Sequence, residues 1–251
     1  MPWGKFLIFG VLLVGCVVAK APASKVDELL INYTDSRLRL LQPEGTLWHG
    51  KGLLASQTLD GRSLVTWLPL TWDIDPASIS HLSFIWNFKN AGIPFGKVEV
   101  SSNEFSLQEV QLNAPLEAVT AISSEPLARI GWHGDISLNL ANLNCTKLLK
   151  CDGKGTVLWK NAHADPFPGR AFGDYQVVVV ANKGNIEYSL KTLDGEIKAV
   201  GDGTVSHSGT YSFKGTVIGD PEFLKRLPNI TDGKARATEE PGKFQINISN
   251  S

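Results

Sequence analysis

The feature that most constrains the fold of this chain is an alternation of apolar and polar side chains with a period of two residues. Residues 82–89 show it most clearly, because bulky apolar side chains occupy every second position there. Successive side chains of a β-strand point to opposite faces of the sheet, so each such run predicts a half-buried strand. The sequence therefore predicts a mainly β fold, built from antiparallel, twisted sheet or sheets with few short helices. The same alternation occurs at residues 136–140, 186–191 and 211–217.

Asp-Gly dipeptides lie between or beside these runs. Asp-Gly supplies the positive φ angle that a tight two-residue hairpin requires. They predict hairpin turns at Asp60-Gly61, Asp152-Gly153, Asp194-Gly195 and Asp202-Gly203.

Only a few segments have helical character. Residues 25–32 are expected to form one or two helical turns that lead into the β-rich part. Residues 115–130 are apolar and contain several alanines, although a proline interrupts them. Residues 142–150 have the length of two helical turns, and residues 221–227 fit a short capped helix with proline at its first position. Residues 244–248 alternate again and predict one closing strand or an untethered tail.

The N-terminal residues differ from the rest of the chain. An uncharged run covers residues 6–19, with Lys5 before it and Lys20 after it. Such a run is typical of a membrane anchor or of the apolar part of a signal peptide. The leading interpretation is one N-terminal membrane helix, with residues 1–24 forming the anchor and a short linker and residues 25–251 forming the β-rich domain.

Two cleaved forms are the alternatives to an intact anchor. Ala21-Pro22-Ala23 before Ser24 resembles a signal-peptidase site. Leu13-Val14-Gly15-Cys16 resembles a lipobox, in which Cys16 would be lipidated and become the new N-terminus.

The composition excludes some partners. The chain has 251 residues, of which 43% are hydrophobic and 20% are charged, and its formal net charge is −1. This is an ordinary mixture for a globular protein. No basic block stands out, so no nucleic acid is expected as a partner.

No segment carries recognisable catalytic, cofactor or metal chemistry. Residues 45–52 nearly fit a phosphate-binding loop, but Gly52 stands where the magnesium-binding Ser or Thr belongs. None of the five histidines has the spacing of a zinc-protease site, and no Gly-x-Ser-x-Gly elbow is present. His49 and His133 each follow Trp and precede Gly, which favours a structural role beside a turn. The sequence therefore predicts a protein that is not an enzyme and has no cofactor and no metal site.

Two cysteines lie close together outside the apolar run. Cys145 and Cys151 are candidates for a disulfide that closes a small loop in an oxidising compartment, and the alternative is two unpaired thiols. A zinc site is not indicated, because no second Cys or His pair lies at ligand spacing.

Most of the tryptophans lie in or beside predicted strands. Filling of the core and packing on a sheet face is one explanation. The functional alternative is an apolar groove for a lipid tail or a partner's strand, lined by Trp72, Trp86 and Trp132.

Short motifs in the sequence resemble those of the type II secretion system protein N family, also called general secretion pathway protein N. One is the segment 43–50 soon after the apolar run, a second is the strand 64–73, and a third is the segment 155–159. The residues that carry the resemblance are Gly45, Thr46, Trp48, Gly50, Trp67, Trp72, Gly155 and Trp159. The pair Cys145 and Cys151 is a departure from the family pattern.

The resemblance implies a bacterial inner-membrane protein that crosses the membrane once and has its main domain in the periplasm. It would be a non-enzymatic accessory component of the machinery that exports folded proteins across the outer membrane. Its partners would be other envelope secretion-system proteins, and no catalytic residues carry over from the family.

A second hypothesis comes from the Gly-Thr-Leu-Trp segment, which also looks like the hairpins of AsmA-type envelope proteins. That likeness implies a periplasmic protein that binds or bridges lipid. A third and weaker hypothesis is a hydrolase that acts on an envelope polymer.

Overall fold

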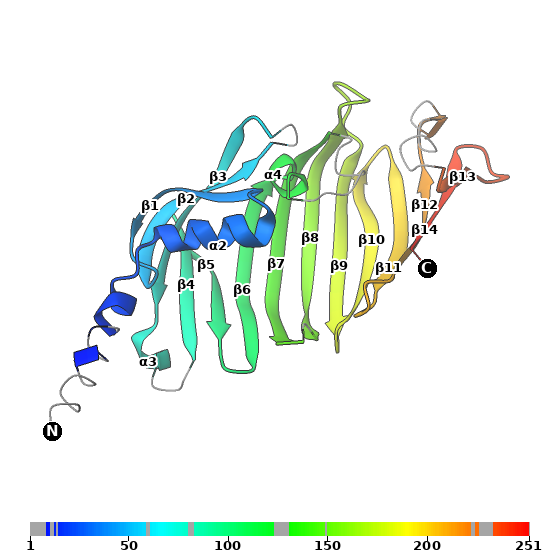
Figure 1. The fold of residues 1–251 in the computed structure, drawn as a ribbon. Helices are drawn as coiled ribbons and strands as arrows, with labels where there is room; N and C mark the ends of the chain where they lie inside the picture. Colours follow the sequence, from blue (N-terminus) through cyan, green and yellow to red (C-terminus); the bar gives the residue numbers. More distant parts are fainter. Residues whose placement is uncertain are drawn as a thin grey trace.

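The structure is a computed structural model that describes residues 9–10, 13, 15–58, 61–79, 83–122, 131–148, 150–221, 224–225 and 233–250. One long twisted sheet forms almost all of it (Figure 1). The N-terminal segment extends away from one end of this sheet, and the C-terminus lies near the opposite end (Figure 1).

The sheet has 14 strands, and all neighbouring strands are antiparallel. Spatial order follows chain order from β1 to β12, and then β14 lies beside β12 with β13 at the edge. This result confirms the predicted mainly β, antiparallel fold. The strands are β1 Leu38–Gly45, β2 His49–Gln57, β3 Leu64–Ile74, β4 Phe84–Asn90, β5 Ile93–Val100, β6 Glu104–Pro115, β7 Trp132–Thr146, β8 Cys151–Ala164, β9 Gly173–Asn182, β10 Asn185–Gly195, β11 Lys198–Val205, β12 Tyr211–Ile218, β13 Ala235–Ala237 and β14 Lys243–Ser249.

The register places apolar side chains from every strand on one face, which we call the apolar face. Residues directly opposite each other in an antiparallel pair share a face. One such row runs from Leu112 through Leu138, Val157 and Val177 to Leu190. The residues between them, such as Asn139, point to the other, polar face. The predicted period of two is therefore continuous across the sheet.

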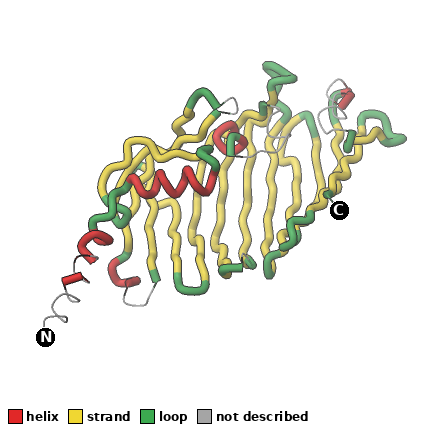
Figure 2. Tube along the Cα trace, viewed as in Figure 1, coloured by secondary structure: helices red, strands yellow, loops and turns green. Residues whose placement is uncertain are grey.

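Short helices accompany the sheet (Figure 2). Among them are α2 Ser24–Thr34, α3 Pro76–Ile79 and α4 Leu116–Thr120. Helix α2 confirms the helical turns predicted for residues 25–32.

Helix α2 also protects the free edge of the sheet. The Asp27 carboxylate accepts a hydrogen bond from the backbone N–H of Leu40 at 2.8 Å. The same carboxylate receives two bonds from the Arg39 guanidinium, at 3.0 and 2.9 Å. An uncovered edge strand invites pairing with other chains, so these contacts block strand addition at β1.

Two separate clusters of buried side chains lie on the apolar face, one toward each end of the sheet. The first, the α2 cluster, packs Val26 and Leu30 of the helix against the sheet. The second, the C-terminal cluster, combines side chains of the later strands with side chains from the connection between β8 and β9. The buried members of the α2 cluster are Ala23, Leu40, Leu70 and Trp72. Those of the C-terminal cluster are Ala162, Ala164, Phe167, Phe172, Tyr175, Ile197, Val217, Leu224 and Ala235.

Some local predictions were wrong. Residues 142–146 do not form a helix but continue β7, because each pairs with a residue of β6. Asp152-Gly153 and Asp202-Gly203 are not turns but lie inside β8 and β11. In both dipeptides the aspartate points to the polar face, and the glycine lies on the apolar face against a neighbouring side chain.

Other predictions fall partly outside the described residues. Helix α4 occupies the start of the segment 115–130, and residues 123–130 lie outside the described part. The same is true of most of the helix predicted at 221–227 and of Asp60 in the Asp60-Gly61 turn. The closing strand predicted at 244–248 is confirmed as β14.

The N-terminal apolar run is described only in part. Residues 1–8, 11, 12 and 14 lie outside the described part. Helices in the described ranges are all too short or too polar to span a membrane. The exposed side chains of the run include Phe9 at 65%, Leu13 at 56% and Val17 at 65%.

Candidate functional site

The turn between β1 and β2 carries the first family-like motif. Gly45 has φ of +91°, a conformation that favours glycine. The Thr46 backbone N–H donates to the His49 carbonyl at 2.8 Å, and the Thr46 hydroxyl accepts from the His49 N–H at 3.1 Å. These bonds fix a tight hairpin whose next residue, Gly50, lies against an aromatic ring of β3.

The ring of Trp72 lies so close to the backbone at position 50 that only glycine fits there. A Cβ atom at position 50 would lie 2.4 Å from Cζ2 of that ring, too close for any other residue. Trp72 is 3% exposed and belongs to the α2 cluster. Trp67 lies five residues earlier at a bulge of β3, is half-buried, and donates its indole N–H to the Ser56 hydroxyl at 3.0 Å.

Three indole rings hold the same turn in place, two by bonds from the sheet and one by a bond to the N-terminal segment. The carbonyl of Leu47 accepts hydrogen bonds from the indoles of Trp72 at 3.1 Å and Trp86 at 3.4 Å. The Trp48 indole donates to the carbonyl of Val18 at 2.8 Å. The turn therefore holds the end of the apolar N-terminal run against the sheet.

Backbone contacts reinforce this attachment. Leu47 N–H donates to the Ala21 carbonyl at 2.8 Å, and Ala23 N–H donates to the Gly45 carbonyl at 3.1 Å. Trp48 also stacks on Phe84 and Trp86 of β4, with ring centroids 5.9 and 6.4 Å apart. A family-like motif that looked like an isolated hairpin thus connects the N-terminal segment with the apolar face.

The later family-like motif lies in the C-terminal cluster. Gly155 pairs with Leu140 of β7 inside β8. Trp159 donates its indole N–H to the His133 carbonyl at 3.0 Å, and its ring contacts Trp132 edge-on at 5.6 Å. Of the residues predicted to line a groove, the structure brings Trp72 and Trp86 together in the α2 cluster and places Trp132 in the other cluster.

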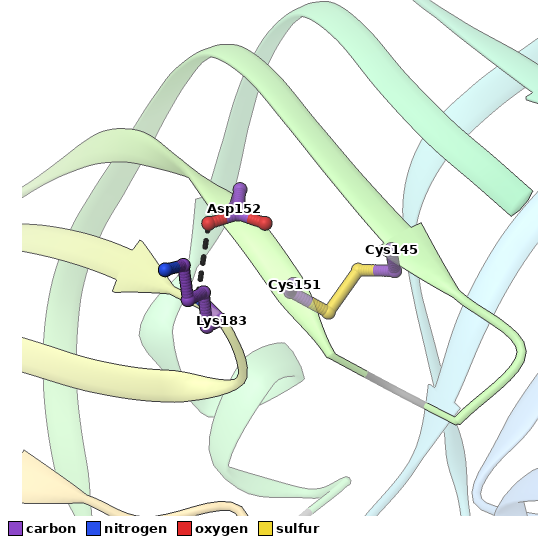
Figure 3. Close-up of a disulfide and its surroundings, with 4 residues drawn as sticks. All are labelled: Cys145, Cys151, Asp152 and Lys183. Atoms are coloured by element: carbon purple, nitrogen blue, oxygen red, sulfur yellow. Dashed lines mark hydrogen bonds between the residues drawn. A yellow bond between two sulfur atoms is a disulfide. The ribbon is translucent and has the colours of Figure 1, made fainter.

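Cys145 and Cys151 are joined by a disulfide in the structure (Figure 3). They are directly opposite each other in the β7–β8 pair, with Cα atoms 4.0 Å apart. The adjacent Asp152 carboxylate accepts a bond from the Lys183 backbone N–H at 2.9 Å, which links this hairpin to the next one (Figure 3). The disulfide therefore closes a hairpin end that is already hydrogen-bonded to its neighbour.

A histidine between two carboxylates was missed by sequence reasoning. Nδ1 of His133 bonds to the Glu117 carboxylate of α4, and Nε2 bonds to the Asp165 carboxylate at 2.8 Å. The His163 ring stacks on His133 at 5.0 Å. The hydrogen bonds to Glu117 and Asp165 raise the pKa of His133 above its usual 6.5, against a smaller opposing effect of burial. These groups come from three separate segments, so no spacing in the sequence signals the cluster.

This arrangement predicts a pH dependence of stability. Because the folded pKa of His133 exceeds its unfolded pKa, the stabilisation is fully present below pH 6.5 and is lost as the pH rises through the raised value. We expect His133→Gln to destabilise the protein more at about pH 6 than at about pH 9, where neutral imidazole predominates. Denaturation of both proteins by urea at the two pH values measures this. His163→Gln is the matched control, since that ring bonds to the Asn161 carbonyl and to no carboxylate in the described contacts. An equal loss at both pH values would contradict the prediction.

The described residues hold no cluster of three or more His, Cys, Asp or Glu side chains arranged to bind a metal ion. Their polar groups serve turns, edges and connections between strands. The side chains on the apolar face offer an apolar surface that can bind a ligand or a partner.

Outside the two buried clusters, the apolar face carries a band of half-buried side chains, which we call the apolar strip. Leu40 and Ala162 in the clusters are 1% and 0% exposed, whereas the side chains of the strip are half-buried. The strip comprises Val98, Leu107, Val110, Leu112, Leu138, Leu140, Leu143, Val157, Val177, Val179, Ile186, Tyr188 and Phe213.

The fold and these sites define a class of protein: an extended single-sheet scaffold with one apolar face, attached at one end to an apolar N-terminal segment. The family model for type II secretion system (T2SS), protein N matches residues 36–230. The chain belongs to this family, which confirms the resemblance seen in its motifs. No curated protein and no solved structure matches the chain.

Proposed function

We propose that this protein is a non-enzymatic accessory component of the type II secretion machinery. The family match over residues 36–230 carries this proposal. It is supported by the structure of the described residues, whose polar groups hold turns and strand connections together. Other envelope secretion-system proteins are its proposed partners.

We further propose that residues 1–24 anchor the protein in the bacterial inner membrane and that residues 25–251 form one periplasmic domain. Two features support this topology: the uncharged run between Lys5 and Lys20, and the bonds that hold Val18 and Ala21 against the β1–β2 turn. A segment held in this way places the turn end of the sheet close to the membrane surface.

Deletion of the gene tests the secretion role. In a strain that exports proteins by the type II machinery, we expect less cargo in the medium and more in the periplasm, with recovery when the full chain is supplied in trans. Unchanged export would contradict the role. Fractionation and N-terminal sequencing of the same strain test the anchor. A soluble product that begins at Ser24 would contradict it, and a lipid-modified product that begins at Cys16 would replace it with a lipoprotein.

A second candidate function is that of a periplasmic lipid-binding or lipid-bridging protein. The half-buried apolar strip is the specific observation that favours it. The two functions are compatible, because a secretion component can also hold lipid.

A further inference from the structure

We infer that the apolar strip binds the acyl chain of a phospholipid drawn from the adjacent membrane. This inference rests on the second candidate function, not on the role in secretion. The strip extends over eight strands from β5 to β12, which at about 4.8 Å per strand is roughly 34 Å. One leaflet of a bilayer has a hydrocarbon thickness of about 15 Å. The strip is therefore long enough to take an acyl chain along its length.

Two aromatic rings of the strip lie flat against glycines of the sheet, so they project little above the sheet. A Cβ at Gly203 would lie 2.2 Å from Cζ of Tyr188, and a Cβ at Gly215 would lie 2.9 Å from Cζ of Phe213. The two rings are nearly parallel, at an angle of 3°. Rings that stood upright would fill the space above the sheet, whereas rings lying on glycine leave that space open above an apolar surface.

The strip offers contacts that suit a hydrocarbon better than a protein surface. No position of the strip carries a charge, and its one hydroxyl, that of Tyr188, already donates to the Ser212 carbonyl at 3.3 Å. Protein interfaces are typically a little over half non-polar and carry many hydrogen bonds. An acyl chain needs only apolar surface removed from water. A partner strand would instead add to a sheet edge, and α2 occupies the β1 edge.

The strip is continuous with the N-terminal segment, which identifies the source of the lipid. Trp48, bonded to Val18, stacks on Trp86, and Trp86 is directly opposite Val98 at the start of the strip. Val98 in turn is opposite Leu107. A hydrogen bond from Trp48 to the apolar run, followed by stacked rings and paired apolar side chains, thus joins the run to the strip.

Charge at the same end of the sheet suits a phospholipid headgroup. Strand directions alternate, so the β7–β8 and β9–β10 turns lie at the end that carries the β1–β2 turn. These turns present the exposed side chains of Lys147, Lys150 and Lys183. Lysines near a membrane surface attract anionic headgroups.

Photo-crosslinking in cells tests the inference with the full chain in its own membrane. Benzoyl-phenylalanine placed at position 138, on the strip, is compared with the same residue at position 139, on the polar face. Cells are labelled either with radioactive phosphate or with radioactive acetate, which enters acyl chains. We expect an adduct with both labels from position 138 and none from position 139. Acyl label without phosphate label would overturn the phospholipid assignment.

Other outcomes would also overturn the inference. These are an adduct of position 138 with another protein, an adduct with a second copy of this chain, equal labelling at position 139, and no adduct at either position. As a further test, the probe at position 157 is combined with Leu138→Glu, which places a charge beside the acyl chain. We expect at least about a tenfold loss of the lipid adduct, and none from the control Asn139→Glu.

Circular dichroism of each variant, purified in a mild non-ionic detergent, shows whether it is folded. The export assay is read separately. Normal lipid labelling, together with unchanged export in the deletion strain, would contradict only the secretion role. Reduced export in the deletion strain, without lipid labelling of the chain, would contradict only this inference.

Discussion

Trp72→Ala is expected to lower the free energy of unfolding by roughly 3–5 kcal/mol, the range found when a fully buried aromatic ring is removed. Trp72 is 3% exposed, and its ring fills the space above Gly50 and beneath α2. Alanine would leave a cavity there and also remove the donor to the Leu47 carbonyl. Urea denaturation of the full chain in a mild non-ionic detergent, followed by circular dichroism, measures the change.

Two variants separate packing from hydrogen bonding at this site. Trp72→Phe keeps an aromatic ring but loses the indole N–H, so we expect a smaller loss than for alanine. Trp67→Ala removes a half-buried ring at a bulge of the same strand, and a loss near 1 kcal/mol is expected, as for an average substitution. A loss of less than about 1 kcal/mol for Trp72→Ala would contradict the view that the α2 cluster is a packed core.

Replacement of both disulfide cysteines, as Cys145→Ser with Cys151→Ser, is expected to cost about 2–3 kcal/mol at most. The two cysteines are separated by six positions, so the bond closes a small loop and removes little chain entropy from the unfolded state. The folded hairpin is held independently, since the Thr146 N–H donates to the Lys150 carbonyl at 3.0 Å. The double variant should therefore still fold.

Formation of this disulfide in the cell is tested by alkylation and mass spectrometry of protein purified without reductant. We expect no label at Cys145 or Cys151. Cys16 is free and exposed, so it provides an internal positive control wherever the N-terminal run is retained without lipid. Leu148→Ser changes an exposed side chain of the same turn and should leave the stability nearly unchanged. Label at both Cys145 and Cys151 in unreduced protein would falsify the pairing.

Local sequence patterns predicted those elements whose structure depends on near neighbours. The alternation at residues 84–88 and 186–191 placed side chains on the correct faces, because the period of a strand is a property of its own backbone, and Leu82 lies outside the described residues. Helix α2 was predicted in the same way. Asp202-Gly203 was misread as a turn, because a glycine within a strand is favoured when a ring from the next strand, here Tyr188, lies on it. That ring is not visible in the local sequence.

The candidate site was predicted less completely. The motif at residues 45–50 was identified from the sequence, but its contacts with Val18 and Ala21 became clear only in the structure. Trp72, Trp86 and Trp132 were grouped as one groove because all three are apolar and lie in strands. The structure separates Trp132 from the other two, because β4 and β7 are three strands apart in the sheet. Residue type alone carries no information on that distance.

By itself, the sequence determined that this chain forms antiparallel strands with one apolar and one polar face, and that its N-terminus is an apolar segment. Both properties follow from side chains within a few residues of each other. Only the tertiary structure decided that the strands form a single sheet, that α2 packs on one end of its apolar face, and that the side chains of the strip from Val98 to Phe213 stay half-buried. Burial of a side chain depends on contacts between segments far apart in the chain, such as Leu30 of α2 against the cluster that contains Trp72, and no local pattern encodes which surfaces will meet.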